Sequence, residues 1–95
     1  MCSMVKREMT ITHEEFLRVF TTAFTKEIIA QGLDFFVIDV DGKEVRIHLN
    51  PEKRKKIASL EWIVTDVDLD LTGLPPEASS RFMVRFERAF QKGGG

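Results

Sequence analysis

The sequence predicts a single α+β domain, in which two amphipathic helices pack on one face of a three-stranded or four-stranded antiparallel sheet. Three observations support this fold class. Phenylalanines recur at helical spacing near both ends of the chain, an Asp-Gly pair separates two alternating segments, and a third alternating segment follows. The expected order is helix, strand, strand, short helix, strand, helix.

The first helix has the clearest start signal in the chain. Thr12 and Glu15 form a capping box, in which each side chain satisfies the other residue's backbone N–H. An apolar stripe follows at helical spacing: Phe16, Val19, Phe20, Ala23, Phe24 and Ile28. Gly32 followed by Leu33 is typical of a helix end, which predicts a helix over 13–31. An earlier end is the alternative, because threonines in its second half are weak helix formers.

A β-hairpin is predicted next. Phe35–Val40 and Lys43–Leu49 flank the pair Asp41-Gly42, which favours a type I′ turn. A two-residue loop fixes the register, so that three pairs of residues lie opposite each other: Val40 with Lys43, Ile38 with Val45, and Phe36 with Ile47.

The second half of the chain contains one long strand and one helix. Asn50-Pro51 can cap a helix, so 51–60 is read as a short helix or a charged loop. Residues 61–71 alternate as a strand does. A helix starting near Pro76 carries a second ladder of phenylalanines: Phe82, Phe86 and Phe90. The two ladders are expected to form the core.

Residues 5–11 alternate weakly and leave a further strand open. With that strand and a helix over 51–60, the alternative fold is a ferredoxin-like βαββαβ arrangement with an extra C-terminal helix. In either case the expected division is a tail over 1–4, one domain over 5–92, and a disordered tail over 93–95.

Composition gives only broad expectations about function. The formal net charge of −1 provides no overall field toward nucleic acid. Cys2 is the only cysteine and cannot form an internal disulfide. No apolar run is long enough for a membrane span, and the N-terminus lacks the apolar core of a secretory signal. We therefore expect a cytoplasmic protein.

Four apolar residues fall on the sheet face that is otherwise polar: Phe35, Val37, Trp62 and Val64. If the helices cover the opposite face, these side chains form an exposed patch, and such patches mark partner interfaces. The first functional hypothesis is therefore a non-enzymatic binding or assembly module, which binds a protein partner or itself. The structural alternative is that a bulge or a tail buries them.

Basic residues suggest a second hypothesis. Four of them share one band of the second helix: Arg81, Arg85, Arg88 and Lys92. The run 53–56 adds four more, and either group could contact phosphates of a nucleic acid or an acidic partner. No aromatic residue interleaves them to stack bases, and the favoured alternative is a solvated helix face and a solvated loop.

A third hypothesis is a divalent-metal-dependent hydrolase built on Asp66, Asp68 and Asp70, which share one strand face. The spacing lacks the glycine and the terminal glutamate of a calcium-binding loop. His13 and His48 have no metal-ligand spacing, and no nucleophile motif is present. The sequence therefore predicts no catalytic residue, no bound metal and no cofactor, and a non-enzymatic role is favoured.

Overall fold

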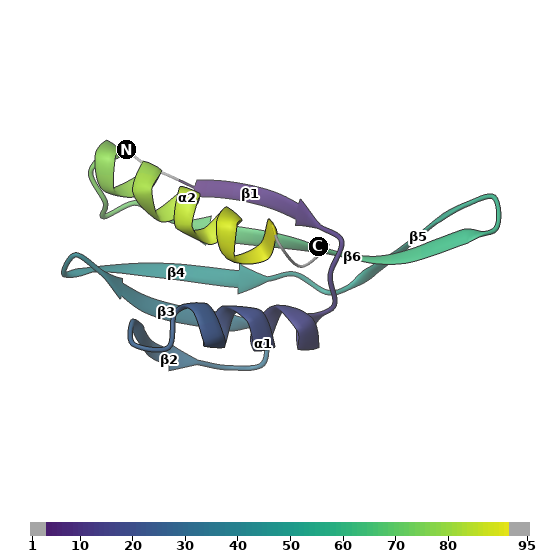
Figure 1. Cartoon of the computed structure of the whole chain (residues 1–95), viewed down its shortest axis with the longest axis horizontal. Coiled ribbons are helices and arrows are strands. Elements are labelled where there is room, and N and C mark those ends of the chain that lie inside the picture. Colours follow the sequence, from purple (N-terminus) through teal and green to yellow (C-terminus); the bar gives the residue numbers. More distant parts are fainter. Residues whose placement is uncertain (1–3, 92–95) are drawn as a thin grey trace.

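A computed structural model describes residues 4–91 as two helices and six strands (Figure 1). Of the predicted tails over 1–4 and 93–95, residues 1–3 and 93–95 lie outside the described residues, whereas Met4 belongs to the first strand. The elements, in chain order, are β1 (Met4–Met9), α1 (His13–Ala23), β2 (Ile28–Gln31), β3 (Phe35–Val40), β4 (Lys43–Leu49), β5 (Lys53–Ile57), β6 (Leu60–Asp70) and α2 (Pro76–Gln91).

The sheet has six strands, so the prediction of three or four strands is wrong. Its order is β1-β6-β4-β3-β2, with β5 paired to β6 beside this path, and every pairing is antiparallel. The ferredoxin-like alternative is also wrong, because five strands follow one another between the two helices. Residues 5–11 do contribute a strand, β1, at one edge of the sheet.

Two segments form strands that the sequence does not predict, and the first helix ends early, as in the shorter alternative. Helix α1 starts as predicted, with Thr12 Oγ1 accepting from the Glu15 amide at 3.1 Å, but it ends at Ala23. Thr22 bonds back to the Arg18 carbonyl at 2.9 Å, a competition with the backbone that weakens a helix end. Residues 28–31 then pair with β3 as β2. Residues 51–60, predicted as a short helix or a charged loop, instead contribute β5 and the turn that follows it.

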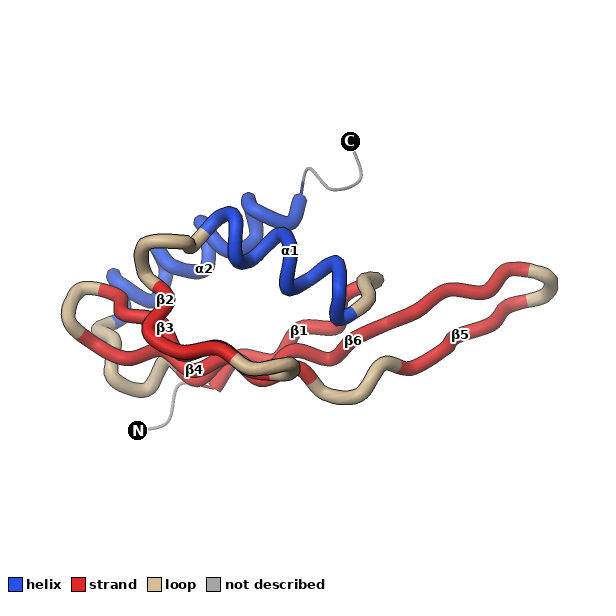
Figure 2. The backbone as a smooth tube through the Cα atoms, turned by 90° about the horizontal axis from the view of Figure 1, so that it is seen from below, coloured by secondary structure: helices blue, strands red, loops and turns tan. Residues whose placement is uncertain are grey.

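Both helices lie on one side of the sheet, as Figure 2 shows, and their phenylalanines enter a single core. Phe20 is fully buried, and its ring lies 4.5 Å from the rings of both Phe24 and Phe36, measured between centroids. The inner sheet face completes this core with alternate residues of β3, β4 and β6. Core packing therefore leaves the opposite face, here called the outer sheet face, free of helices.

The predicted hairpin is confirmed. Strands β3 and β4 pair in the expected register, with Ile38 opposite Val45. Asp41 and Gly42 both have positive φ, 52° and 80°, as a type I′ turn requires. This register places the odd-numbered residues of β3 and the even-numbered residues of β4 on the outer sheet face.

Candidate functional site

A two-stranded ribbon projects from the body of the molecule (Figures 1 and 2). Strand β6 is shared between the two parts: residues 65–70 pair with β1, whereas residues 60–64 pair only with β5. We call residues 53–64 the arm. Neither helix covers it, and every residue of β5 is exposed.

A bulge joins the arm to the sheet. Strand β5 continues β4 along the same edge of β6: Leu49 lies opposite Val67, and Lys53 lies opposite Val64. The edge formed by β4 and β5 advances four residues from Leu49 to Lys53, whereas β6 advances three from Val67 to Val64. The edge therefore contains one extra residue, which makes it a bulge. Asn50 fills the irregularity, since its Nδ2 donates to the Asp66 carbonyl at 2.9 Å.

The bulge decides which side chains of the arm face outward. Odd-numbered residues of β4 lie on the inner face, but those of β5 lie opposite even-numbered residues of β6, on the outer face. One face of the arm therefore carries an apolar row bordered by two lysines: Val64, Trp62, Leu60 and Ile57, with Lys53 and Lys55.

The apolar row becomes more exposed toward the tip of the arm. Val64 is buried and Trp62 is half-buried, whereas Leu60 and Ile57 are 68% and 64% exposed. The tip therefore presents two large apolar side chains to solvent.

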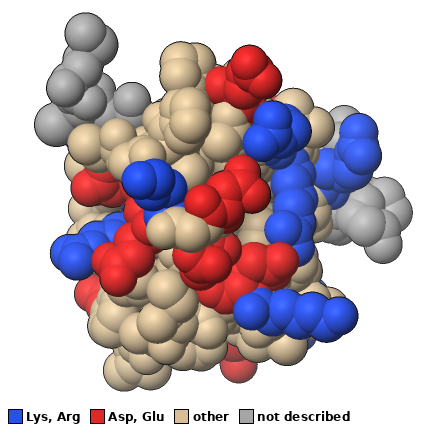
Figure 3. Space-filling view, turned by 90° about the vertical axis from the view of Figure 1, so that its left-hand side faces the viewer, with Lys and Arg blue, Asp and Glu red and all other residues tan. Residues whose placement is uncertain are grey.

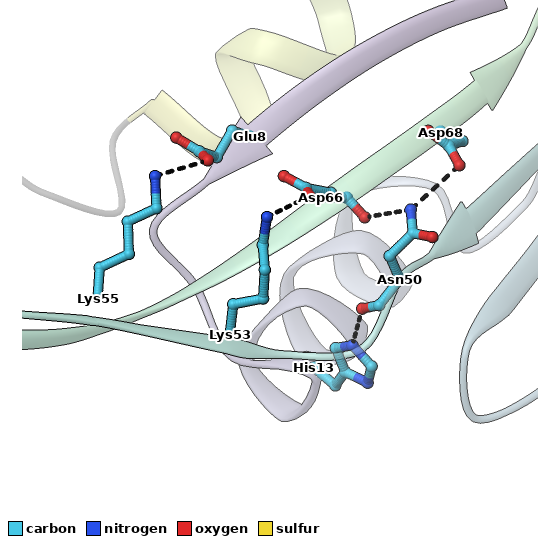
Figure 4. A network of polar contacts seen from close by, with 7 residues as sticks. All are labelled: Glu8, His13, Asn50, Lys53, Lys55, Asp66 and Asp68. Atoms are coloured by element: carbon cyan, nitrogen blue, oxygen red, sulfur yellow. Dashed lines mark hydrogen bonds and ion pairs between the residues drawn. The ribbon is translucent and has the colours of Figure 1, made fainter.

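Ion pairs hold the root of the arm against the sheet (Figure 4). Lys53 Nζ lies 2.7 Å from Asp66 Oδ2, and Lys55 Nζ lies 2.9 Å from Glu8 Oε2. The hydrogen bond and the charge of Asp66 raise the pKa of Lys53. Glu8 and Asp66 stand directly opposite each other on β1 and β6, a repulsive arrangement that the two lysines offset.

The outer sheet face is acidic. Its charged residues on β1, β3, β4 and β6 comprise six carboxylates and two cations: Glu8, Asp39, Glu44, Asp66, Asp68 and Asp70, with Lys6 and Arg46. Asp39 and Glu44 form a second pair of directly opposed carboxylates. Arg46 lies 3.5 Å from Glu44, at ion-pair distance.

A shallow pocket of about 520 Å³ opens on this face. Apolar side chains of β1 and β3 contribute Met4, Phe35 and Val37, and polar ones from β4 and β6 form its rim: Arg46, His48, Asp68 and Asp70. Phe35 is 40% exposed. The pocket therefore combines an apolar surface with carboxylates.

The four residues predicted as a partner patch fall into two groups. Phe35 and Val37 line the outer-face pocket, whereas Trp62 and Val64 belong to the arm. His48 lies opposite both Phe35 on β3 and Asp68 on β6, so strand β4 lies between Phe35 and β6. Along β6, Asp68 and Val64 are four residues apart, which is roughly 13 Å. Val64 is buried, so it is not part of an exposed surface.

Two of the four residues in the predicted basic band on α2 are engaged in contacts within the chain. Arg81 pairs with Asp41 at 3.3 Å. Arg85 pairs with Glu27 at 3.2 Å and lies 4.3 Å above the ring of Phe24. Figure 3 shows Lys and Arg beside Asp and Glu at this end of the molecule. Arg88 is exposed, and Lys92 lies outside the described residues.

Each of the three predicted metal-ligand aspartates has a protein partner. Asp66 binds Lys53, and Asp68 Oδ2 accepts from Asn50 Nδ2 at 3.1 Å. Asp70 Oδ1 accepts from the amide and the hydroxyl of Thr72, and these bonds lower the pKa of Asp70. Within residues 4–91, no group of three or more His, Cys, Asp or Glu side chains is placed to hold a metal ion.

No protein-family model, curated protein or solved structure matches the chain. Neither α1 nor the described part of α2 combines the length and the apolar character that a membrane-crossing helix needs.

Proposed function

We propose that this chain is a non-enzymatic assembly module that self-associates through its arm. The observation that carries the proposal is the exposure of Ile57 and Leu60 at the tip of a ribbon that the body does not cover. A two-stranded ribbon gains little stability of its own in water. Large apolar side chains at its end gain burial only when a second molecule covers them.

The edges of the arm support the same function. Strand β5 pairs only with β6, and residues 60–64 of β6 pair only with β5, so both edges keep unpaired backbone groups. Exposed edges promote uncontrolled pairing, and basic side chains on an edge strand oppose it. The basic run 53–56 therefore opposes uncontrolled pairing along the edge of the arm. The apolar tip beyond this run stays available for a specific contact.

The test is the solution mass as a function of protein concentration. We expect the wild-type mass to rise above the 10.9 kDa of one chain, and the double variant Ile57→Ser/Leu60→Ser to stay at that value. Leu33→Ser is the matched control, since Leu33 is 85% exposed and lies in the turn between β2 and β3. Equal masses for the wild type and the arm variant at every concentration would refute self-association through the arm.

A second candidate is nucleic-acid binding by the arm. Within residues 4–91, neither Arg54 nor Lys56 lies within 4.0 Å of a carboxylate, so both could contact phosphates. Fluorescence anisotropy with labelled duplex DNA and RNA at low salt tests this. Binding whose salt slope falls by about two in Arg54→Gln/Lys56→Gln would support it; unchanged anisotropy for both duplexes would remove it.

A further inference from the structure

We infer that the receptor for the arm is the outer-face pocket of a second copy of this chain, and that two copies exchange arms reciprocally. This inference rests on the proposed function and adds the surface to which the tip binds. Three independent features of the described residues support it: charge, apolar fit, and the placement of the tip and pocket along one strand.

Charge divides the chain into a basic arm and an acidic remainder. The arm carries four basic residues and one acidic residue, Glu61, for a net charge of +3. The whole chain has a formal charge of −1, so the remainder carries −4. Because the acidity concentrates on the outer sheet face, this face of one copy attracts the arm of another.

The two opposed carboxylate pairs on the outer sheet face differ in how many cations offset their charge. Lys53 and Lys55 of the same chain neutralise Glu8 and Asp66 at the root of the arm. Asp39 and Glu44 form the second pair, and Arg46 is the one cation that lies within 4.0 Å of either carboxylate among residues 4–91. The basic arm of a second copy, with a net charge of +3, would therefore approach a face whose second carboxylate pair is offset by one cation.

The apolar parts also correspond. Ile57 and Leu60 lie opposite each other at the last pair before the turn, so they form one compact apolar knob. The outer-face pocket offers Phe35, Val37 and Met4 as apolar contacts and has room for a group of this size. Two carboxylates of its rim, Asp68 and Asp70, lie on the same outer sheet face as the pocket's apolar residues, where the basic arm would lie.

The chain cannot place its own knob in its own pocket. Leu60 and Asp68 belong to one continuous strand, and eight residues of strand span roughly 26 Å. Both lie on the same face, since residues of equal parity on β6 face the same way. A second copy is therefore needed to fill the pocket.

The same placement makes the exchange reciprocal. If two copies stack their outer faces with β6 strands antiparallel, a two-fold axis near Val64 brings each knob over the partner's pocket. The contact is then isologous and closes at two copies, without open-ended growth. The half-buried Trp62 of each copy would lie near the axis, next to the knob that enters the partner's pocket.

A mixing experiment tests the inference. The arm variant Ile57→Ser/Leu60→Ser keeps its pocket, and the pocket variant Phe35→Ser keeps its arm; each should dissociate at least roughly tenfold more readily than wild type, as expected for losing one buried apolar side chain. An equimolar mixture should regain part of the dimer, because one arm–pocket contact is intact. Added salt should weaken the wild-type dimer.

The outcomes separate the two proposals. If the arm variant is monomeric while Phe35→Ser dimerises like wild type, the pocket is not the receptor, and self-association through the arm stands. If the arm variant dimerises like wild type, both proposals fail. Circular dichroism checks that each variant is folded. Val37→Ser is the second pocket variant, to be used if Phe35→Ser does not fold, and it must show the same dissociation and the same recovery on mixing.

Discussion

The turn at the tip of the arm offers a sharp test of how the arm is built. Ala58 and Ser59 connect β5 to β6, and Ala58 has a φ of 56°. The left-handed region costs an L-residue roughly 1–2 kcal/mol, whereas glycine adopts it freely. Glycine loses about 0.5–1 kcal/mol through its greater freedom in the unfolded chain. We therefore expect Ala58→Gly to stabilise the arm by up to about 1.5 kcal/mol.

Hydrogen exchange of individual amides is the suitable assay, because the arm can open without unfolding the body. Cross-strand amides of residues 53–64 should exchange up to roughly tenfold more slowly in Ala58→Gly, which is the rate equivalent of that free energy. Gly42→Ala is the opposite control: Gly42 has a φ of 80° with open space around it, so the added Cβ changes only the backbone strain and the freedom of the unfolded chain. Faster exchange in the arm of Ala58→Gly would refute this account of the turn.

Three further perturbations concern the body. Phe20→Ala should lower the free energy of unfolding by about 3–5 kcal/mol in chemical denaturation, because its fully buried ring leaves a cavity among other phenylalanines; a loss below about 1 kcal/mol would contradict this packing. Thr12→Ala should cost about 1 kcal/mol in the same assay, since the Glu15 amide loses its acceptor, and no loss would mean that the cap does not stabilise α1. Thr72→Val should raise the pKa of Asp70, measured by NMR titration, because the hydroxyl bond that lowers it is gone; an unchanged pKa would refute that cause. The stabilisation from Asp70 is complete above its unfolded-state pKa and is lost as the pH falls through the lower folded-state pKa, so the variant should lose less stability on acidification.

Much of the body could be predicted because local signals agree with the fold. The Asp41-Gly42 turn sets the register of β3 and β4, and the Thr12 cap starts α1. Strand β2 was missed because Ile28 continues the apolar stripe of the preceding helix, so periodicity alone does not mark the helix end. Pairing with β3 decides its structure, and that contact lies outside the local pattern.

The arm could not be predicted for a different physical reason. Residues 53–56 are all basic, so they show neither alternation nor a helical stripe, and the turn at Ala58-Ser59 has no glycine. No sequence pattern indicates the bulge at Asn50 either. The bulge places odd-numbered residues of β5 on the outer face, whereas odd-numbered residues of β4 lie on the inner face. The predicted patch around Trp62 therefore contained residues of the candidate site without showing that they belong to two separate surfaces.

Trp62 provides the most direct test of arm exchange, because it is the only tryptophan and lies in the apolar row of the arm. Its emission should move to shorter wavelength, and iodide should quench it less, over the same concentration range in which the mass doubles. The Ile57→Ser/Leu60→Ser variant should show neither change. Emission and quenching of the wild type that stay constant across that range would contradict burial of the arm in a second copy.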